Sequence, residues 1–360
     1  MKISEILPAW YEKNKRDLPW RHTLDPYRVW LSEVILQQTR VKQGLGYYLV
    51  FLENFPDVFS LAEAHEDSVM KLWQGLGYYT RARNLHETAR VVAGDMGGEM
   101  PRRYEDLLKL KGVGSYTAAA IASICFGEPR AVVDGNVARV ISRLFGVEEP
   151  VNGPQGNRII ARLAEEILDR EQPGRHNQAL MEFGSLQCIP SGPDCGSCPL
   201  AGSCVARGSG RVEMLPVKLP KRKPLKRWMY YYIMVHANGE TILTRRNGND
   251  IWRSLYQFPL VESERSLEDG ELAARIQPEL LPEDVDVTLE KISPEVKHQL
   301  THRTLHAKFI HLRPHQWPDP LPADWLKIPV ERLHEFPVPR LITRYLEVVN
   351  FSYLCIRNQN

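Results

Sequence analysis

The segment "RGSGRVEMLPVKLPKRKPLKR", residues 207–227, divides the chain into two parts with different hydrophobic periodicity. Before it, apolar residues recur at helical spacing, as in "VWLSEVILQQTRV" and "GNRIIARLAEEILDR". After it, "RWMYYYIMVHANGETILTRRN" predicts a β-hairpin, and "HRTLHAKFIHL" alternates as a strand does. We therefore predict a helical domain over 1–206, an extended basic linker over 207–227 and an α/β domain over 228–350, and we assign no role to 351–360.

Composition sets few limits on the partners of the chain. The net charge of the 360 residues is only +2, but Lys and Arg exceed Asp and Glu by 31 to 26 in residues 1–227 and fall short by 15 to 18 in residues 228–360. A polyanion would therefore meet the first part more readily than the second. The charged N-terminal residues do not resemble a signal peptide and no apolar run is long enough to span a membrane, so we expect a cytoplasmic protein.

Four of the six cysteines fall within 17 residues in the order C-x6-C-x2-C-x5-C. They are Cys188, Cys195, Cys198 and Cys204. Thiolates at such short spacing can close around a metal or a cluster, and in a cytosolic chain this crowding favours metal binding over disulfides. The spacing by itself fits a four-cysteine zinc site and a [4Fe–4S] cluster equally well.

Two carboxyl groups are candidates for acid–base chemistry. Glu33 shares a helical face with Val29 and Leu36, and desolvation among apolar groups raises the pKa of a carboxyl. Asp134, in "AVVDGNVARV", is predicted to cap a helix, and N–H donors would keep it ionised. One protonated and one ionised carboxyl are what glycosidic cleavage requires. An ion-paired glutamate and a plain helix cap remain the alternatives.

The stretch "LKGVGSYTAAAI", residues 110–121, places two glycines at the mouth of a helix. Glycine reaches positive φ and lets another backbone approach closely, and a helix N-terminus offers free N–H groups to a phosphate. The turn is thus either a simple connection between two helices or a site that binds the phosphate backbone of a nucleic acid.

Several motifs occur together and in order, namely "LPWR", "SEVILQQTRV", "GLGYYTRARNL", "LKGVGSYTAAAI" and "VDGNVARV", followed by the cysteine cluster. From Leu18 to Cys204 this combination resembles the helix-hairpin-helix DNA glycosylases of the endonuclease III superfamily, and within them the adenine DNA glycosylases. The resemblance implies a multidomain α and α+β fold class. An all-helical glycosylase domain, with its hairpin at about 108–122 and an iron–sulfur loop at 188–204, precedes a Nudix-like α/β domain.

The resemblance also implies a reaction. Adenine mispaired with 8-oxoguanine or guanine would be flipped out of double-stranded DNA and released by hydrolysis. Glu33 would protonate N7 of the base and Asp134 would stabilise the sugar cation, with support from Asn136 and Tyr116. In bifunctional relatives a lysine stands at the position of Tyr116 and Lys111 is misplaced for that role, so a monofunctional enzyme is implied. The family's cysteine spacing holds a [4Fe–4S] cluster, which favours iron–sulfur over zinc.

The other site residues implied by the resemblance form two sets. Residues that match the adenine pocket are Trp20, Arg21, Leu36, Gln178 and Met181. Residues that match DNA contacts are Gln38, Thr39, Leu76, Tyr78, Gly112, Gly114, Leu300, Thr301 and His302. We further expect a monomer associated with the nucleoid, without a membrane partner. The linker would be a tether or a contact for phosphate or for other repair or replication proteins.

The C-terminal part resembles the Nudix-like domain of the same family through "WRSLYQFPL". The acidic metal-binding box of Nudix hydrolases is missing after Pro259, which favours recognition over hydrolysis. "HQLTHRTLH" stands where the family carries a His-x-Phe-Ser-His loop that senses 8-oxoguanine. Leu300 and Thr301 replace the phenylalanine and serine of that loop, whereas His302 is kept.

Two other functions fit parts of the sequence. The same fold could excise mismatched thymine or oxidised pyrimidines, although the added C-terminal domain argues against this. A non-catalytic DNA-binding or scaffold protein with a structural metal site is the third hypothesis. Glu33 and Asp134, both intact in their motifs, argue against that one.

Overall fold

The computed structural model describes residues 3–220, 223–282 and 285–349. The tail 351–360, Cys355, and Lys221 and Arg222 of the predicted linker lie outside these residues. The chain divides into two compact units, one of Met1–Glu63 with Asn84–Lys221 and the other of Ala64–Arg83 with Arg222–Asn360. Among the described residues, no helix combines the length and the apolar character needed to cross a membrane.

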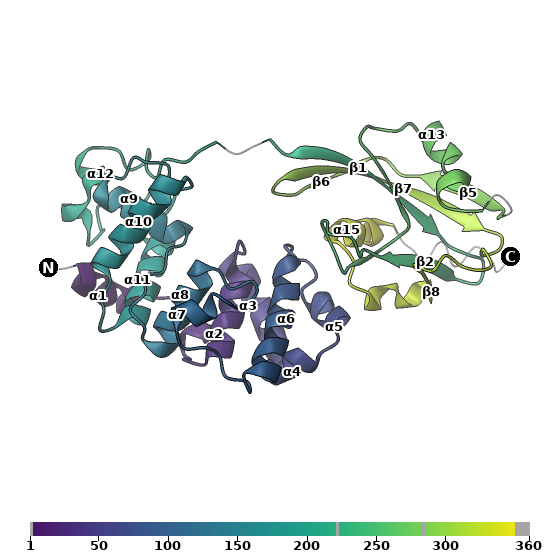
Figure 1. Cartoon of the computed structure of the whole chain (residues 1–360). Helices are drawn as coiled ribbons and strands as arrows, with labels where there is room; N and C mark the ends of the chain where they lie inside the picture. Colours follow the sequence, from purple (N-terminus) through teal and green to yellow (C-terminus); the bar gives the residue numbers. More distant parts are fainter. Residues whose placement is uncertain (1–2, 221–222, 283–284, 350–360) are drawn as a thin grey trace. The chain divides into compact units, whose positions relative to one another are not determined.

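The first unit is helical, as the sequence predicts, and its helices are coloured purple to teal in Figure 1. Its helices are α1 (Ile3–Asn14), α2 (Pro26–Leu36), α3 (Val41–Asn54), α4 (Val58–Glu63), α6 (Thr80–Asp95, which begins in the other unit), α7 (Tyr104–Leu107), α8 (Ser115–Phe126), α9 (Gly135–Phe145), α10 (Pro154–Ile167), α11 (Pro173–Leu186) and α12 (Val205–Gly208), with short 3-10 turns η1 (Pro19–Arg21) and η2 (Ala201–Ser203).

Helix α9 shows how the sequence builds this unit. Asp134 caps its N-terminus by accepting hydrogen bonds from the N–H groups of Asn136 (2.8 Å) and Val137 (2.7 Å), as predicted. Gly146, with φ 69°, ends the helix in the left-handed conformation that glycine adopts without strain. Between the two ends, apolar residues recur at three- and four-residue spacing and face the core.

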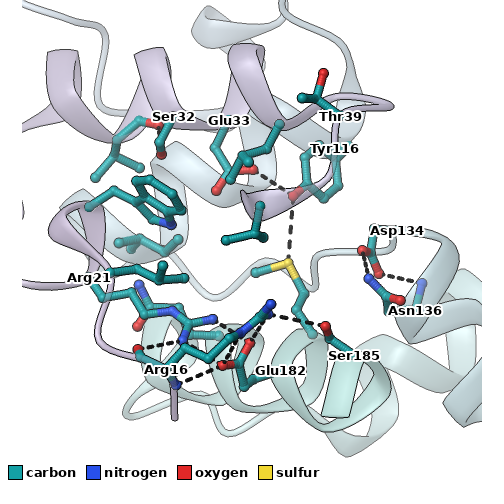
Figure 2. Close-up of a pocket in the computed structure, with 18 residues that line it drawn as sticks. Arg16, Arg21, Ser32, Glu33, Thr39, Tyr116, Asp134, Asn136, Glu182 and Ser185 are labelled. Carbon is teal, nitrogen blue, oxygen red and sulfur yellow. Dashed lines mark hydrogen bonds and ion pairs between the residues drawn. The ribbon is translucent and has the colours of Figure 1, made fainter. Parts of the chain in front are cut away.

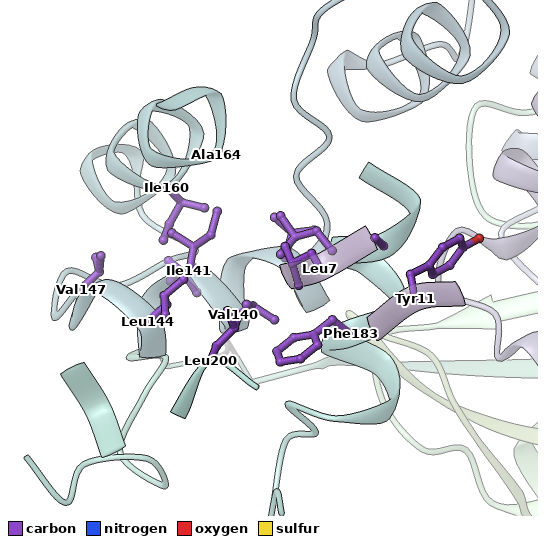
Figure 3. Close-up of a cluster of buried hydrophobic side chains, with 14 residues drawn as sticks. Leu7, Tyr11, Val140, Ile141, Leu144, Val147, Ile160, Ala164, Phe183 and Leu200 are labelled. Carbon is purple, nitrogen blue, oxygen red and sulfur yellow. The ribbon is translucent and has the colours of Figure 1, made fainter. Parts of the chain in front are cut away.

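That core lies among α1, α9, α10 and α11. Figure 3 shows Leu7 and Tyr11 of α1 approaching Phe183, while Val140, Ile141 and Leu144 of α9 lie near Ile160 and Leu200. Cys188, Cys198 and Cys204 pack against the edge of the same cluster as partly buried side chains. The core therefore joins the start of α9, where Asp134 lies, to the cysteine segment.

The second unit holds two β-sheets, drawn green to yellow in Figure 1. One sheet has the order β4-β1-β7-β5, with β6 also pairing with β7, and the other has the order β3-β2-β8. The strands are β1 (Leu225–Met234), β2 (Glu240–Arg245), β3 (Tyr256–Gln257), β4 (Leu260–Ser263), β5 (Val287–Ile292), β6 (Val296–Gln299), β7 (Arg303–Pro314) and β8 (Trp325–Pro329). The helices are α5 (Glu66–Leu72), α13 (Asp269–Ala274), α14 (Ile276–Glu279) and α15 (Arg340–Val348), with the 3-10 turn η3 (Val330–Glu335).

Strands β1 and β7 form the centre of the larger sheet. They run parallel, from Leu225 opposite Arg303 to Met234 opposite Leu312. On one face Tyr230 and Tyr232 pack with residues of the α13–α14 region, and on the other Phe309 stacks on Tyr345 of α15 at 3.6 Å. Burial on both faces explains why "MYYYIM" is apolar throughout instead of alternating.

The predicted hairpin around "ANGE" is wrong as a two-stranded unit. Strand β1 already pairs with β4 on one edge and β7 on the other, so β2 joins the smaller sheet through β3 and β8. Only an isolated bridge, Val235 with Thr241, remains between the two runs. The turn signal was correct, but the tertiary partners determined the pairing.

The predicted linker is not a simple tether in the part that ends at Leu219. The N–H of Val151 donates to the carbonyl of Val217 (3.0 Å), and the N–H of Leu219 donates to the side chain of Asn152 (2.7 Å). Leu215 is buried and its carbonyl accepts a bond from Arg143. The last residues of the segment belong to strand β1, which begins at Leu225.

Candidate active site and DNA-contact surface

A pocket in the helical unit gathers the residues that the sequence predicts for catalysis. Figure 2 shows Glu33 from α2, Tyr116 from α8, and Asp134 and Asn136 at the start of α9 around it. All five residues that match the adenine pocket of the family line the same cavity: Trp20, Arg21, Leu36, Gln178 and Met181. Residues separated by more than 140 positions in the sequence therefore meet at one place.

Glu33 is the acid candidate and is only 7% exposed. Its pKa is raised to about 7, chiefly by burial and also by the nearby Asp134, while Tyr116 and Arg21 act to lower it. The Tyr116 hydroxyl donates to Oε2 of Glu33 at 2.5 Å, which leaves Oε1 to carry an acidic proton. The raised pKa expected from the apolar helix face is thus confirmed, and it suits a general acid near neutral pH.

Asp134 differs in one respect from the sequence expectation. Its N–H donors, Val137 and Asn136, lower its pKa, and Arg139 acts in the same direction, but burial is the larger effect and the pKa lies above its usual value. The side-chain amide of Asn136 donates a further bond to Oδ2 at 2.7 Å. Asp134 is therefore a desolvated carboxyl held in a fixed orientation at the pocket wall.

Asn136 is itself held from the opposite side. Arg139 donates to Oδ1 of Asn136 (2.9 Å), to the carbonyl of Gly184 (2.6 Å) and to the carbonyl of Cys188 (2.8 Å). Gly184 allows the close approach of α11 to α9, because a Cβ there would lie 2.8 Å from Asn136. The orientation of the Asp134–Asn136 pair thus depends on contacts with the segment that begins at Cys188.

An ion-paired carboxyl that the sequence reasoning missed lies in the same pocket. Glu182 is 1% exposed and accepts hydrogen bonds from Arg21 (2.6 and 2.7 Å) and from Arg16 (2.5 and 2.9 Å). Burial opposes ionisation, but the two arginines outweigh it and hold the pKa of Glu182 at about 2. A signal existed, since Gln178, Met181, Glu182 and Ser185 follow helical spacing on α11 and all line the cavity.

The hairpin glycines lie in a neighbouring groove. Gly112 has φ 76°, and a Cβ on it would meet the side chain of Asn84 at 2.6 Å, so this position requires glycine. Gly114 caps α8 with extended backbone and faces open space. The groove is also lined by Gln38, Thr39 and Asp134, so it adjoins the catalytic pocket. Lys111 instead forms an exposed ion pair with Glu87 at 2.6 Å.

The predicted DNA-contact residues of the second unit meet in another pocket. Tyr78, Leu300, Thr301 and His302 line it, and the hydroxyl groups of Tyr78 and Thr301 form a hydrogen bond. Tyr78 is 45% exposed and has φ 48°, which is unusual for a bulky residue, whereas Leu76 is buried. The structure therefore brings Tyr78 to the loop that contains Thr301 but turns Leu76 into the interior.

The cysteine segment offers four free thiols of intermediate exposure. Within the described ranges, no group of three or more His, Cys, Asp or Glu side chains is compact enough to hold a metal ion. Burial raises the pKa of Cys198, and Cys188, Cys195 and Cys204 raise it further, so the four sulfurs are within electrostatic reach of one another. Arg143 donates to the sulfur of Cys188 at 3.4 Å, as donors around cluster thiolates do.

Comparisons with known proteins identify the family of the chain. Residues 31–168 match the family model of the HhH-GPD superfamily base excision DNA repair protein, and residues 230–348 match a NUDIX domain model. The "Adenine DNA glycosylase" of Buchnera aphidicola subsp. Baizongia pistaciae is 32% identical over 301 residues, which is 84% of this chain and 83% of that protein. The human protein of the same name is 44% identical over 218 residues, which is 58% of this chain and 40% of that protein.

Solved structures resemble a little more than half of the chain. A thermostable thymine-DNA glycosylase aligns with TM-score 0.53 and 31% identity, over 57% of this chain and 95% of its own. A non-covalent endonuclease III–DNA complex aligns with TM-score 0.50 and 23% identity, over 58% of this chain and 94% of that one, a likeness in fold alone.

Proposed function

The chain belongs to the adenine DNA glycosylase family of base excision repair, and from this premise we propose that it excises adenine paired with 8-oxoguanine or guanine in duplex DNA. The observation that carries the proposal is the meeting of Glu33, Tyr116 and Asp134 in one pocket beside the glycine hairpin. The adenine would leave the base stack and enter this pocket, because the enzyme cannot reach its target atom inside a duplex.

In the proposed mechanism Glu33 protonates the adenine at N7 while the N-glycosidic bond breaks. The bonding electron pair moves to the base, which leaves neutral, and the deoxyribose becomes an oxocarbenium ion. Asp134 stabilises that cation or bonds to it briefly. Water then adds to the anomeric carbon, any bond to Asp134 breaks, and the proton released by the water passes to the Glu33 carboxylate, which restores the acid. Tyr116 and Asn136 hold the two carboxyls in place through the hydrogen bonds described above.

Tyr116 also limits the chemistry. A phenol cannot form the Schiff base that a lysine forms with the sugar, and Lys111 pairs with Glu87 away from the pocket. We therefore propose that base removal proceeds without a lysine-driven strand cut. Glu182, ionised between two arginines, already accepts five hydrogen bonds from Arg16 and Arg21, so it would hold the two guanidinium groups at the pocket wall.

DNA binding by the hairpin groove would be largely independent of sequence, whereas the pocket of the C-terminal unit would recognise a base. The N–H groups at Gly112 and Gly114 suit a phosphate, which fixes register without reading bases. Gln38 and Thr39 lie between this hairpin and the pocket, where they could fill the gap left by the flipped base. The Tyr78, Thr301 and His302 pocket would receive the opposite purine.

We propose that Cys188, Cys195, Cys198 and Cys204 hold a [4Fe–4S] cluster. Four half-buried thiols that influence one another, with Arg143 donating to one sulfur, form a donor set of the required kind. When bound, the cluster would stabilise residues 188–204 and take no part in hydrolysis of the glycosidic bond. Its effect on the pocket would run through Arg139, which links the Cys188 carbonyl to Asn136.

Release of free adenine, measured by mass spectrometry from a duplex with one A:8-oxoguanine pair, tests the proposal. We expect adenine release with an intact sugar–phosphate backbone. The second candidate is thymine or oxidised-pyrimidine excision, which the thymine-DNA glycosylase similarity favours, although that likeness covers 57% of this chain. Thymine release from a G:T duplex, without adenine release, would decide for the second candidate, and release of neither would favour a scaffold.

A further inference from the structure

Asp250 is the hub of an ion cluster in the C-terminal unit. Its Oδ2 accepts from Arg227 at 2.5 Å and from Arg246 at 3.0 Å, and its Oδ1 accepts from Arg303 at 2.8 Å. The side chain is 25% exposed, so these pairs are partly shielded from water. Charge-assisted hydrogen bonds of this kind are shorter and stronger than neutral ones, and they fix geometry as well as add energy.

The arginines of this cluster come from separate parts of the unit. Arg227 lies on β1, Arg246 directly follows β2, and Arg303 begins β7 immediately after the loop of Leu300, Thr301 and His302. Asp250 itself lies two residues before Trp252. Asp250, Trp252, Arg303 and the three loop residues all line the pocket that also holds Tyr78. Asp250 therefore connects two walls of this pocket.

Backbone strain marks the wall that Asp250 and Trp252 form. Among the described residues, the non-glycine residues with positive φ are Gln38, Tyr78, Trp252 and Ser254. Gln38 and Tyr78 are DNA-contact candidates from the sequence. Trp252, at φ 62°, is 8% exposed and packs edge-on against His298 at 6.0 Å. Such strained residues persist only where neighbouring contacts over-determine them, and they gather at ligand sites.

Arg246 makes several of the contacts that hold the turn around Trp252 in this conformation. Its guanidinium donates to the carbonyl of Ile251 at 3.1 Å, its backbone carbonyl accepts from Ser254, and its backbone N–H donates to Leu255. Its ion pair with Asp250 closes the same turn from the side-chain side. Loss of the Asp250 charge would release this turn and Arg303 together.

On the basis of the proposed function, we infer that Asp250 is a specificity-determining positioning residue for the purine opposite the excised adenine. It contacts no reacting atom. It sets the separation between the turn that holds Trp252 and the loop of Thr301, so that the pocket accepts an oxidised purine in preference to guanine.

The test compares single-turnover adenine release from A:8-oxoguanine and A:G duplexes at one fixed salt concentration. Asp250→Asn keeps the shape and removes the charge, and we expect it to reduce the ratio of the two rates by about tenfold. Asp250→Glu, which restores the charge, should recover part of the ratio. The matched control is Glu262→Gln, because Glu262 pairs with Arg227 and Arg246 in the same cluster but does not line the pocket.

An unchanged rate ratio in Asp250→Asn would overturn the inference, and so would an equal loss in Glu262→Gln. If Asp250→Asn fails to fold, Arg303→Gln removes the ion pair that links Asp250 to the recognition loop, and an unchanged ratio in that variant overturns the inference as well. Wild-type protein that releases adenine from neither duplex would instead overturn the proposed function. The two failures are therefore distinguishable.

Discussion

Replacement of Tyr116 by phenylalanine should move the alkaline limit of adenine release to higher pH. In the wild type the acid must be protonated, so activity should fall as pH rises through about 7, the pKa that burial gives Glu33. The Tyr116 hydroxyl lowers that pKa by donating to the carboxylate at 2.5 Å. A hydrogen bond to a charged group is worth roughly 1.5–3 kcal/mol, and one pKa unit is 1.36 kcal/mol, so loss of the donor should shift the limit upward by about one to two pH units.

The assay measures the second-order rate constant of adenine release from an A:8-oxoguanine duplex, under single-turnover conditions, between pH 5 and 9. The pH dependence of this rate constant reports the pKa values of the free enzyme. Phenylalanine retains the ring packing, so the melting temperature of the variant is the control for folding. Glu33→Gln is the reference: it should lower the rate by about 10²–10⁴ and abolish the alkaline limb. A Tyr116→Phe profile that superimposes on the wild-type profile would refute this account of how Glu33 is tuned.

Four further outcomes follow from the geometry. Glu33→Gln should raise the free energy of unfolding by up to about 3 kcal/mol at pH 8 and by much less at pH 4. The reason is that the folded pKa of the Glu33 carboxyl is raised from 4.5 to about 7, so this carboxyl destabilises the fold as pH rises between those values. Urea unfolding at both pH values measures the difference. Glu182→Gln should cost about 3 kcal/mol at pH 7, an effect that is lost as pH falls from 4.5 through about 2. Gly112→Ala should lower the melting temperature and weaken duplex binding, whereas Gly114→Ala should fold normally, because only Gly112 has positive φ and a crowded Cβ position. Cys198→Ser should lose bound iron and lower the protease resistance of residues 188–204, and zinc without iron in anaerobically prepared wild-type protein would contradict the cluster assignment.

The features that sequence predicted best are those encoded within one or two turns of chain. Asp134 as a helix cap, Glu33 on an apolar face and the need for glycine at Gly112 all depend on neighbours only a few residues away. The alternation of β7 could be read for the same reason. Local patterns contain enough information for these positions because the surroundings that decide them are contiguous in sequence.

The features that sequence missed depend on distant partners. Glu182 and Arg16 are 166 residues apart, and the helical spacing around Glu182 places it on the pocket side of α11 without showing which partner it meets. The predicted hairpin failed because the edges of β1 are taken by β4 and β7, the second of which lies more than 70 residues further along the chain. The raised pKa of Asp134 could not be predicted from the sequence either. Its helix-cap hydrogen bonds are local, but the burial that outweighs them comes from residues that pack around the pocket.

Glu33 and Glu182 illustrate the same division within one cavity. They are identical side chains, both nearly inaccessible to solvent, yet burial raises the pKa of Glu33 to about 7 whereas Arg21 and Arg16 overcome burial and hold that of Glu182 at about 2. One is therefore suited to donate a proton at neutral pH and the other only to accept hydrogen bonds. The sequence shows only that both residues are glutamates. The partners that folding brings to each side chain determine which of the two is protonated and can act as the acid.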